Sequence, residues 1–214
     1  MLTRRAKYAA GFTMIEAMVT LTVFAILAAL TVPSMATWIR NNKVRTVTDS
    51  LQTGLRLAQA ESLRRSRQVV FALTNSTTPA AIPLPAVANG TSWAIWTIPS
   101  MTNAADEAPT FVQSGVLSNA SAGVVVTGVA AVCFNSMGRL VNNASANVTA
   151  ITGAANCVQP TTPPPQQPTA PPAEVFSIST PGADRPLQIN LSLGGQVHMC
   201  DPAVALSAQF PEGC

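Results

Sequence analysis

Apolar residues are concentrated near the start of the chain, where no charge interrupts them. After Glu16 the next charged residue is Arg40, and 23 positions lie between the two. At about 1.5 Å of rise per helical residue, such a run reaches roughly 35 Å, enough to cross a ~30 Å hydrocarbon core. The pattern therefore predicts a membrane-spanning helix over residues 12–39, with Trp38 as an interfacial aromatic side chain.

Two residues depart from this apolar pattern. Glu16 lies just inside the run, where an ionised carboxylate costs roughly 2.5–3.5 kcal/mol and needs a partner. Pro33 lies towards its end, and a proline removes one backbone hydrogen bond and usually bends the helix. We expect Glu16 to be functional and Pro33 to mark a kink.

Beyond Arg40 the spacing of apolar residues changes to three and four positions. The small or apolar side chains on this spacing are Val44, Val47, Leu51, Leu55, Ala58 and Ser62. Charged side chains such as Arg45 and Arg56 fall between them, which is typical of an amphipathic helix that packs on a sheet. We expect this helix over residues 40–67, ending in an arginine cluster at 64–67 that complements the helix dipole.

The rest of the chain, residues 68–214, shows the signals of a strand-rich head. The expected strands are Gln68–Thr74, Ser92–Ile98, Phe111–Leu117, Gly123–Val129, Val132–Phe134, Arg139–Val141, Val175–Thr180, Leu187–Leu193 and Gln196–Met199. Gly138 and the pair Gly194-Gly195 mark hairpin turns. Trp93 or Trp96 is expected in the core. The fold class is α+β, with one long N-terminal helix packed on an antiparallel, β-rich head.

Two segments of the head carry loop signals. Residues 75–91 are rich in Pro, Asn, Thr and Ala. Residues 142–173 look inserted between strands, and seven prolines lie between Pro160 and Pro172. Such a tract favours polyproline II, so we expect an exposed, semi-rigid loop.

Charge is scarce and unevenly distributed. Charged residues are 10% of the chain and apolar residues 48%, and the formal net charge is +3. Three cations, Arg4, Arg5 and Lys7, precede the apolar run; without them the net charge is 0. Residues 40–67 carry +5, whereas residues 68–214 carry −4. A head this acidic is a poor general binder of phosphate, which argues against nucleic acid as a partner.

The four cysteines are Cys133, Cys157, Cys200 and Cys214. None forms a C-x-x-C pair, and one histidine cannot complete a usual zinc site. An even number behind an export segment favours disulfides, for which three connectivities are possible. We favour Cys133–Cys157 and Cys200–Cys214 because each closes a local loop.

The first 11 residues form a basic leader, for which two interpretations are open. A secretory signal would be cleaved after the apolar run, where Ala28-Ala29 and Met35-Ala36 offer only weak sites. Alternatively the chain is cut between Gly11 and Phe12, so that the apolar segment is retained. The basic residues before the run place the head away from the cytoplasm in this second case.

The sequence Gly11-Phe12-Thr13-Met14-Ile15-Glu16 resembles the processing motif of type IV prepilins. The resemblance implies a type IV pilin-like fold, cleavage after Gly11 by the prepilin peptidase of the inner membrane, and N-methylation of Phe12. It also implies that Glu16 pairs with the α-amine of Phe12 in a neighbouring subunit, which neutralises two charges in an apolar bundle. The implied partners are other pilins or pseudopilins, and the head would lie in the periplasm.

Further segments are similar to one group within this family. Leu51–Phe71, Cys133–Arg139 and Gly195–Pro202 resemble the H-type minor pseudopilins of type II secretion and the fimbrial T- and U-type minor pilins. This implies a structural subunit of a pseudopilus or pilus, in a tip or priming complex. The group's features do not separate the two machines.

Little in the sequence indicates other chemistry. His198 is the only histidine and lies on an expected strand, so no acyl-transfer triad can be argued around it. Asp106-Glu107 lacks the further oxygen ligands that calcium requires. No cofactor fingerprint is present, and we expect no enzyme. The alternatives are a DNA-uptake minor pilin, for which Arg139 and Arg185 are the nearest arginines, and a membrane-anchored protein that never polymerises.

Overall fold

The computed structural model describes residues 11–99, 108–117, 123–142, 151–152, 157, 159–165 and 172–214. Its elements are α1 (Met14–Arg65), β1 (Val69–Thr74), β2 (Leu84–Pro85), β3 (Ser92–Thr97), β4 (Thr110–Val116), β5 (Val125–Thr127), β6 (Ala131–Phe134), β7 (Leu140–Val141), β8 (Ile151–Thr152), β9 (Ala173–Ser179), β10 (Leu187–Ser192) and β11 (Val197–Cys200). The chain divides into one compact unit up to Ile39 and a second from Arg40 to Cys214, here called the head. The predicted leader, apart from Gly11, and the Asp106-Glu107 pair lie outside the described residues.

The helix α1 is 52 residues long and is helical through Pro33. The kink expected there stays a prediction. The helix ends at Arg65, two residues before the predicted end, because Ser66 takes a left-handed conformation with φ of 51°. Arg67 N donates to Ser62 O at 3.2 Å and Ser66 N donates to Leu63 O at 3.3 Å. These are the two bonds of a Schellman C-cap, which turns the chain directly into β1.

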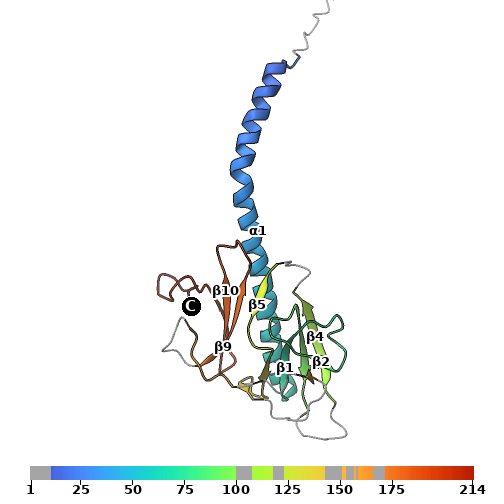
Figure 1. The fold of residues 1–214 in the computed structure, drawn as a ribbon. Coiled ribbons are helices and arrows are strands. Elements are labelled where there is room, and N and C mark those ends of the chain that lie inside the picture. Colours follow the sequence, from blue (N-terminus) through green and yellow to red (C-terminus); the bar gives the residue numbers. More distant parts are fainter. Residues whose placement is uncertain are drawn as a thin grey trace, which may run out of the picture. The chain divides into compact units, whose positions relative to one another are not determined.

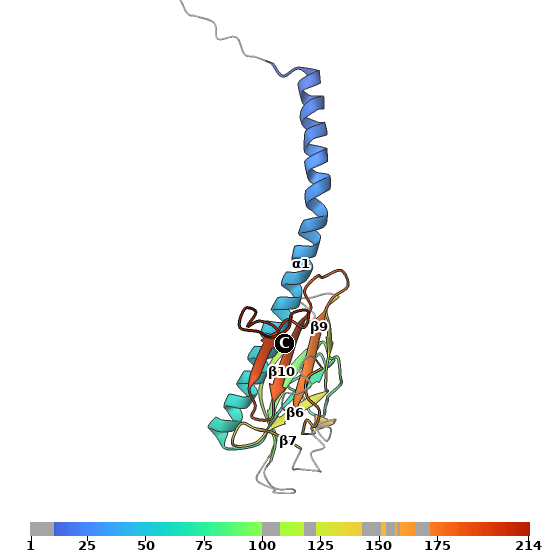
Figure 2. The ribbon, with the colours of Figure 1, turned by 90° about the vertical axis from the view of Figure 1, so that its left-hand side faces the viewer.

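Two antiparallel sheets form most of the head. The five-stranded sheet has the order β4-β3-β1-β6-β7, and the four-stranded sheet has the order β11-β10-β9-β5. Figures 1 and 2 show strands of both sheets lying along the part of α1 that belongs to the head. The predicted α+β architecture is confirmed.

The main core lies between this half of α1 and the two sheets. Val44, Val47, Leu51, Leu55, Ala58 and Ser62, the predicted inner face of the helix, are all at most 2% exposed. The five apolar side chains among them pack in one cluster with Phe71 and Trp93 of the five-stranded sheet and with Phe176 and Ile189 of the four-stranded sheet. A Cβ on Gly54 would lie only 2.9 Å from the Phe71 ring, so glycine allows the helix and β1 to approach closely.

A second apolar layer covers the other face of the five-stranded sheet. Val70, Ala72, Trp96 and Cys133 point into it, because successive side chains of a strand face opposite sides. Leu84 of β2 and Cys157 cover these residues, and Cys157 is joined to Cys133 by a disulfide. Trp93 and Trp96 are therefore both buried, one on each face of the sheet.

This second layer corrects two expectations. Residues 75–91 are not only a loop, since β2 forms a parallel pair with β8 in the 142–173 insertion. The head is thus antiparallel only in its two large sheets. The described part of the proline tract is not simply exposed either, because Pro160 and Pro164 are buried and Ala173 N donates to Thr162 O at 3.0 Å. Much of the insertion lies outside the described residues.

The two predicted hairpin turns are present and meet each other. Gly138 and Gly195 have φ of 73° and 85°, conformations that L side chains rarely adopt. Leu140 N donates to Leu193 O at 3.0 Å, which ties β7 of one sheet to the end of β10 in the other. Among the strands, β5 departs most from expectation, with three residues where seven were predicted.

Candidate functional site

The start of α1 is set by a capping threonine. Thr13 Oγ1 accepts a hydrogen bond from Glu16 N at 3.3 Å, and Thr13 O accepts one from Ala17 N at 3.2 Å. Threonine followed three positions later by glutamate is the sequence pattern of a capping box. Glu16 therefore lies in the first helical turn, where its negative charge complements the positive end of the helix dipole.

Gly11 and Phe12 precede this cap and are exposed. The ideal Cβ position of Gly11 has no neighbouring atom within 4 Å. A peptide bond between Gly11 and Phe12 is therefore accessible to a protease, and no packing has to be broken to reach it. Among the described residues, no hydrogen bond or ion pair holds the Glu16 carboxylate.

The apolar segment that follows is exposed along its length. Its exposed large side chains are Met14, Ile15, Met18, Val19, Leu21, Val23, Phe24, Ile26, Leu27, Leu30, Val32, Met35, Trp38 and Ile39. In the part of the chain that the structure describes, α1 is a helix long and apolar enough to cross a membrane, and none of its most apolar 18-residue window is buried. A surface this apolar is a binding surface for lipid or for other apolar helices.

Hydroxyl groups within this segment are bonded to the helix itself. Thr20 Oγ1 donates to Ala17 O at 3.0 Å, Thr22 Oγ1 donates to Val19 O at 2.8 Å, and Thr31 Oγ1 donates to Leu27 O at 3.1 Å. Polar groups in hydrocarbon must be paired internally, and these pairings meet that requirement. The Glu16 carboxylate, by contrast, has no hydrogen bond or ion pair among the described residues, and its charge needs a partner from outside the segment.

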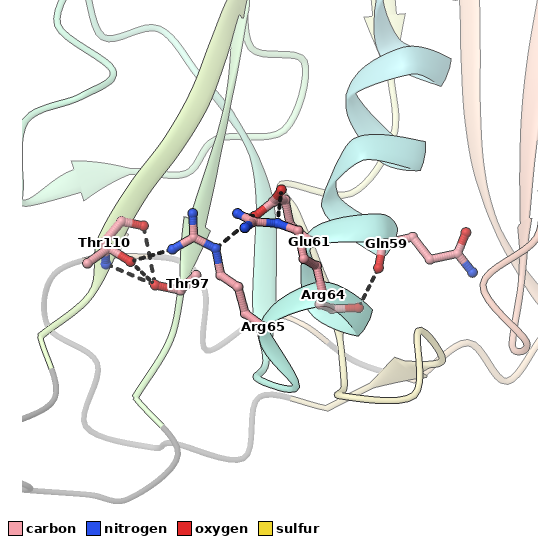
Figure 3. A network of polar contacts seen from close by, with 7 residues as sticks. Gln59, Glu61, Arg64, Arg65, Thr97 and Thr110 are labelled. Carbon is pink, nitrogen blue, oxygen red and sulfur yellow. Dashed lines mark hydrogen bonds and ion pairs between the residues drawn. The ribbon is translucent and has the colours of Figure 1, made fainter.

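At the other end of α1, a polar network joins the helix to β4 (Figure 3). Glu61 accepts from Arg64 Nη2 and from Arg65 Nε, both at 2.7 Å, and Arg65 Nη1 donates to Thr110 Oγ1 at 3.5 Å. Hydrogen bonds from Arg64 and then Arg65 lower the pKa of Glu61 to about 2. The same contact with Glu61 raises the pKa of Arg64.

A pocket of about 510 Å³ lies beside this network, lined by Arg65, Arg67, Thr97, Ile98, Pro99, Ala108 and Thr110. The guanidinium group of Arg65 already binds Glu61 and Thr110, so it stabilises the fold. Within the described residues, no three His, Cys, Asp or Glu side chains come together to hold a metal ion. The arginine cluster therefore closes the helix and anchors it to the sheet.

The head arginines that DNA binding would use lie far apart. Arg185 N donates to Asn41 Oδ1 at 3.3 Å, whereas Arg139 follows Gly138, whose carbonyl accepts from Gln59. Asn41 and Gln59 are 18 helical positions apart, or about 27 Å. His198 is exposed on β11. The structure does not bring these three residues into one basic surface.

The cysteines form two disulfides, Cys133–Cys157 and Cys200–Cys214, which are the two local pairs favoured from the sequence. The second closes a C-terminal loop whose exposed Leu206 and Phe210 the sequence analysis did not single out. The signal for them was available, because no charge occurs between Asp201 and Glu212.

Known families match both parts of the chain. The family model described as Type II transport protein GspH matches residues 47–195, more than half of the chain. The model described as a prokaryotic N-terminal methylation motif matches residues 6–32. No curated protein sequence matches the chain.

Two solved structures are similar to it. One is the type IV minor pilin FimU of Pseudomonas aeruginosa, with 15% identity over 79% of this chain and 96% of that chain, and a TM-score of 0.46. The other is the minor pseudopilin EpsH from the type 2 secretion system of Vibrio cholerae, with 10% identity over 76% of this chain and 99% of that chain, and a TM-score of 0.44.

Proposed function

Since the chain belongs to the family of type II transport protein GspH, we propose that it is a minor pilin or pseudopilin, a structural subunit of a pilus or pseudopilus. It is inserted once in the bacterial inner membrane with its head in the periplasm. Its N-terminal helix then carries it into the filament. The proposal contains no catalytic step.

The observation that carries this proposal is the exposed apolar half of α1 behind the Gly11-Phe12 junction. No part of the chain that the structure describes covers this surface, since none of its most apolar window is buried. Before assembly, a bilayer covers it. After assembly, the equivalent helices of neighbouring subunits cover it, and the internally bonded threonines suit both surroundings.

The capping geometry supports a role for Glu16 in assembly. Cleavage after Gly11 creates a new α-amine on Phe12, which lies four positions before Glu16. A carboxylate in the first helical turn of one subunit can bind the amine of the next, which removes both charges from contact with hydrocarbon. Removing one partner of such a buried pair typically costs about 3–5 kcal/mol.

The first test is mass spectrometry of the native protein, which should begin with N-methylated Phe12. A mature chain with any other first residue would contradict the proposed processing.

The second test is Glu16→Val, which should leave cleavage and membrane insertion unchanged but prevent incorporation into filaments. Thr20→Val is the matched control, because Thr20 lies one turn further along and bonds only its own helix. Incorporation of the Glu16→Val subunit at the level of the control would refute the role of Glu16.

DNA uptake, the alternative function, gains no support from the separated arginines. It would require salt-dependent binding of duplex DNA by the protein in a gel-shift experiment. Affinity purification of the protein decides whether it belongs to a pilus or to a secretion pseudopilus. The assembly ATPase and the pilins that are purified with it identify the machine.

A further inference from the structure

Strand β4 forms one end of the five-stranded sheet and is exposed. In the order β4-β3-β1-β6-β7, β4 pairs with β3 alone among the described strands. All residues of β3 are buried, whereas no residue of β4 is. A strand at the end of a sheet has one row of N–H and C=O groups that no neighbouring strand binds. β4 therefore presents an open hydrogen-bonding edge.

The groups on this open edge follow from the pairing of β4 with β3. Leu117 N donates to Thr91 O at 2.9 Å. Backbone groups alternate in direction along a strand, so those of Ser114 and Val116 point away from β3. Within the described residues, no backbone group bonds this open side. A register shift interrupts the pairing only before Gln113, so Gln113–Val116 is a regular stretch.

Charge and proline, which usually block the pairing of exposed edges, are absent from β4. The strand also has exposed apolar side chains. Phe111 is 36% exposed and Val116 is 49% exposed. Phe111 packs edge-on against Trp96, with 5.4 Å between the ring centroids. An added strand would bond the open groups and cover these two side chains, so the edge fits an extended segment with apolar residues.

The pocket at the start of β4 adds a preference for negative charge. It has a volume of about 510 Å³, and Thr110, the first residue of β4, lines it. Arg64, Arg65 and Arg67 accompany a single carboxylate, Glu61, so the described residues at this place have a net charge of +2. None of the described residues that line the pocket is acidic. Arginines bind carboxylates through charge-assisted hydrogen bonds, so the pocket fits an acidic group.

The bonds that Arg65 makes within the head leave donors for such a group. Arg65 Nε donates to Glu61 at 2.7 Å and Nη1 donates to Thr110 Oγ1 at 3.5 Å (Figure 3). These bonds use two of the five N–H groups of a guanidinium. The Arg65 side chain is 32% exposed, and Arg67 lines the same pocket. A carboxylate in the pocket can therefore accept hydrogen bonds without displacing Glu61.

We propose that the open edge of β4 binds an extended segment of a partner protein, which adds a strand beside Ser114 and Val116 and places an acidic side chain in the pocket at Arg65 and Arg67. The occupant is a peptide because the edge offers backbone donors and acceptors, and it is acidic because the pocket is cationic. Main-chain bonds supply affinity and the carboxylate fixes the register. The contact lies in the head alone, so it does not depend on how the subunit enters a filament.

The test begins with a library of short random peptides displayed on phage and selected against the full chain in detergent. The enriched peptides should alternate β-branched or aromatic residues with polar ones and should carry an Asp or Glu. Fluorescence anisotropy of labelled synthetic copies then gives their affinities.

Ser114→Pro tests the added strand. It removes an N–H group of the open side and no bond to β3, so circular dichroism should show an unchanged fold. The affinity for the selected peptides should fall roughly tenfold or more, because proline blocks the edge and removes a main-chain hydrogen bond.

Arg67→Gln tests the pocket. It should weaken binding roughly tenfold, the effect of losing a hydrogen bond to a charged group. Replacing the acidic residue of the peptide by its amide should cause the same loss, and combining both changes should cause little further loss. Arg45→Gln is the matched control, because Arg45 is exposed and lies 20 helical positions before Arg65, or about 30 Å away. It should bind the peptides like the wild type.

Failure to enrich any peptide, or equal affinities for the wild type, Ser114→Pro and Arg67→Gln, would overturn the proposal. Dimers of the chain that Ser114→Pro abolishes would identify a second copy as the occupant instead. Binding that appears only in the variant Asp106→Asn/Glu107→Gln would show that the chain's own acidic pair fills the pocket, which also contradicts a partner. None of these measurements involves filament incorporation, so their failure is distinct from a failure of the proposed function.

Discussion

Gln59 Nε2 donates a hydrogen bond of 3.1 Å to the carbonyl oxygen of Gly138, although 79 positions separate the two residues. The ideal Cβ position of Gly195 lies 2.5 Å from the same Gln59 nitrogen and 2.0 Å from the same Gly138 oxygen. The side chain of one helical glutamine thus lies where hairpin turns from the two sheets meet. This junction and the main core together hold both sheets on α1.

Gly195→Ala should destabilise the head. The methyl group would overlap the Gly138 carbonyl, and φ of 85° is strained for alanine, so we expect a loss of about 1–3 kcal/mol. Gly194→Ala is the matched control, because its Cβ would meet no atom nearer than 3.7 Å. Denaturant unfolding of the full chain in detergent, followed by the fluorescence of Trp93 and Trp96, measures both. Similar midpoints for the two variants would contradict the close approach of the turns.

Leu55→Ala tests the packing of α1 on the sheets. Leu55 has no exposed surface, and its truncation should cost about 2–5 kcal/mol because a cavity remains. Leu63→Ala on the same helix removes a side chain that is 51% exposed and should change stability by less than about 0.5 kcal/mol. The same unfolding experiment separates the two. If Leu55→Ala unfolds at the same denaturant concentration as Leu63→Ala, the packing of this helix face does not stabilise the head.

Lowering the pH should weaken the ion pairs that Glu61 makes with Arg64 and Arg65 at the end of α1. Hydrogen bonds from Arg64 and Arg65 lower the pKa of Glu61 from its ordinary value of 4.5 to about 2 in the folded protein, so the folded state favours the ionised carboxylate. Its contribution is complete above about pH 4.5 and is lost as the pH falls towards about 2. Glu61→Gln should therefore lower stability at neutral pH and reduce the loss on acidification.

The control for this experiment is Asp49→Asn. Asp49 faces Arg45 at 4.0 Å, and both side chains are more than half exposed, so this pair contributes little. Unfolding midpoints measured from neutral pH down to pH 2 compare the variants. If Glu61→Gln and the wild type lose stability in parallel, the ion pairs at Glu61 do not stabilise the fold.

Loss of the second disulfide should act locally. The double variant Cys200→Ala/Cys214→Ala opens a loop with a sequence separation of 14, for which the chain-entropy model gives about 3 kcal/mol. Amide hydrogen exchange should become faster over residues 201–213 and stay unchanged over β1. The matched variant Cys133→Ala/Cys157→Ala should instead affect β6 and the cover of the second apolar layer. If amide hydrogen exchange becomes faster throughout the head in both variants, the two disulfides do not stabilise separate regions.

The main core could be predicted from the sequence because its signals are periodic. Three- and four-residue spacing identified the buried face of α1, and the Gly138 and Gly194-Gly195 signals identified both hairpin turns. The end of α1 was placed two residues late, because a Schellman cap usually has glycine where this chain has Ser66.

The second apolar layer could not be predicted, for a physical reason. Its strands β2 and β8 have two residues each, too few to show a period, and their paired residues are 67 positions apart in the sequence. A proline-rich composition indicates an extended chain but does not indicate what that chain packs against, so the burial of Pro160 and Pro164 was missed.

For the candidate site, the residues Gly11, Phe12 and Glu16 were available from the sequence, because a short motif at a fixed position carries them. Their roles in processing and assembly stay predictions. Leu206 and Phe210 were not singled out, because the uncharged stretch between Asp201 and Glu212 does not show which of its side chains are exposed.

The five-stranded sheet lies between α1 on one side and the segments containing β2 and Cys157 on the other. A subunit that stacks against the head from the second side therefore touches this outer covering where it lies over β1, β3 and β6. Changes of sequence in the covering can alter that neighbour's contacts while the strands and the helix beneath keep their packing.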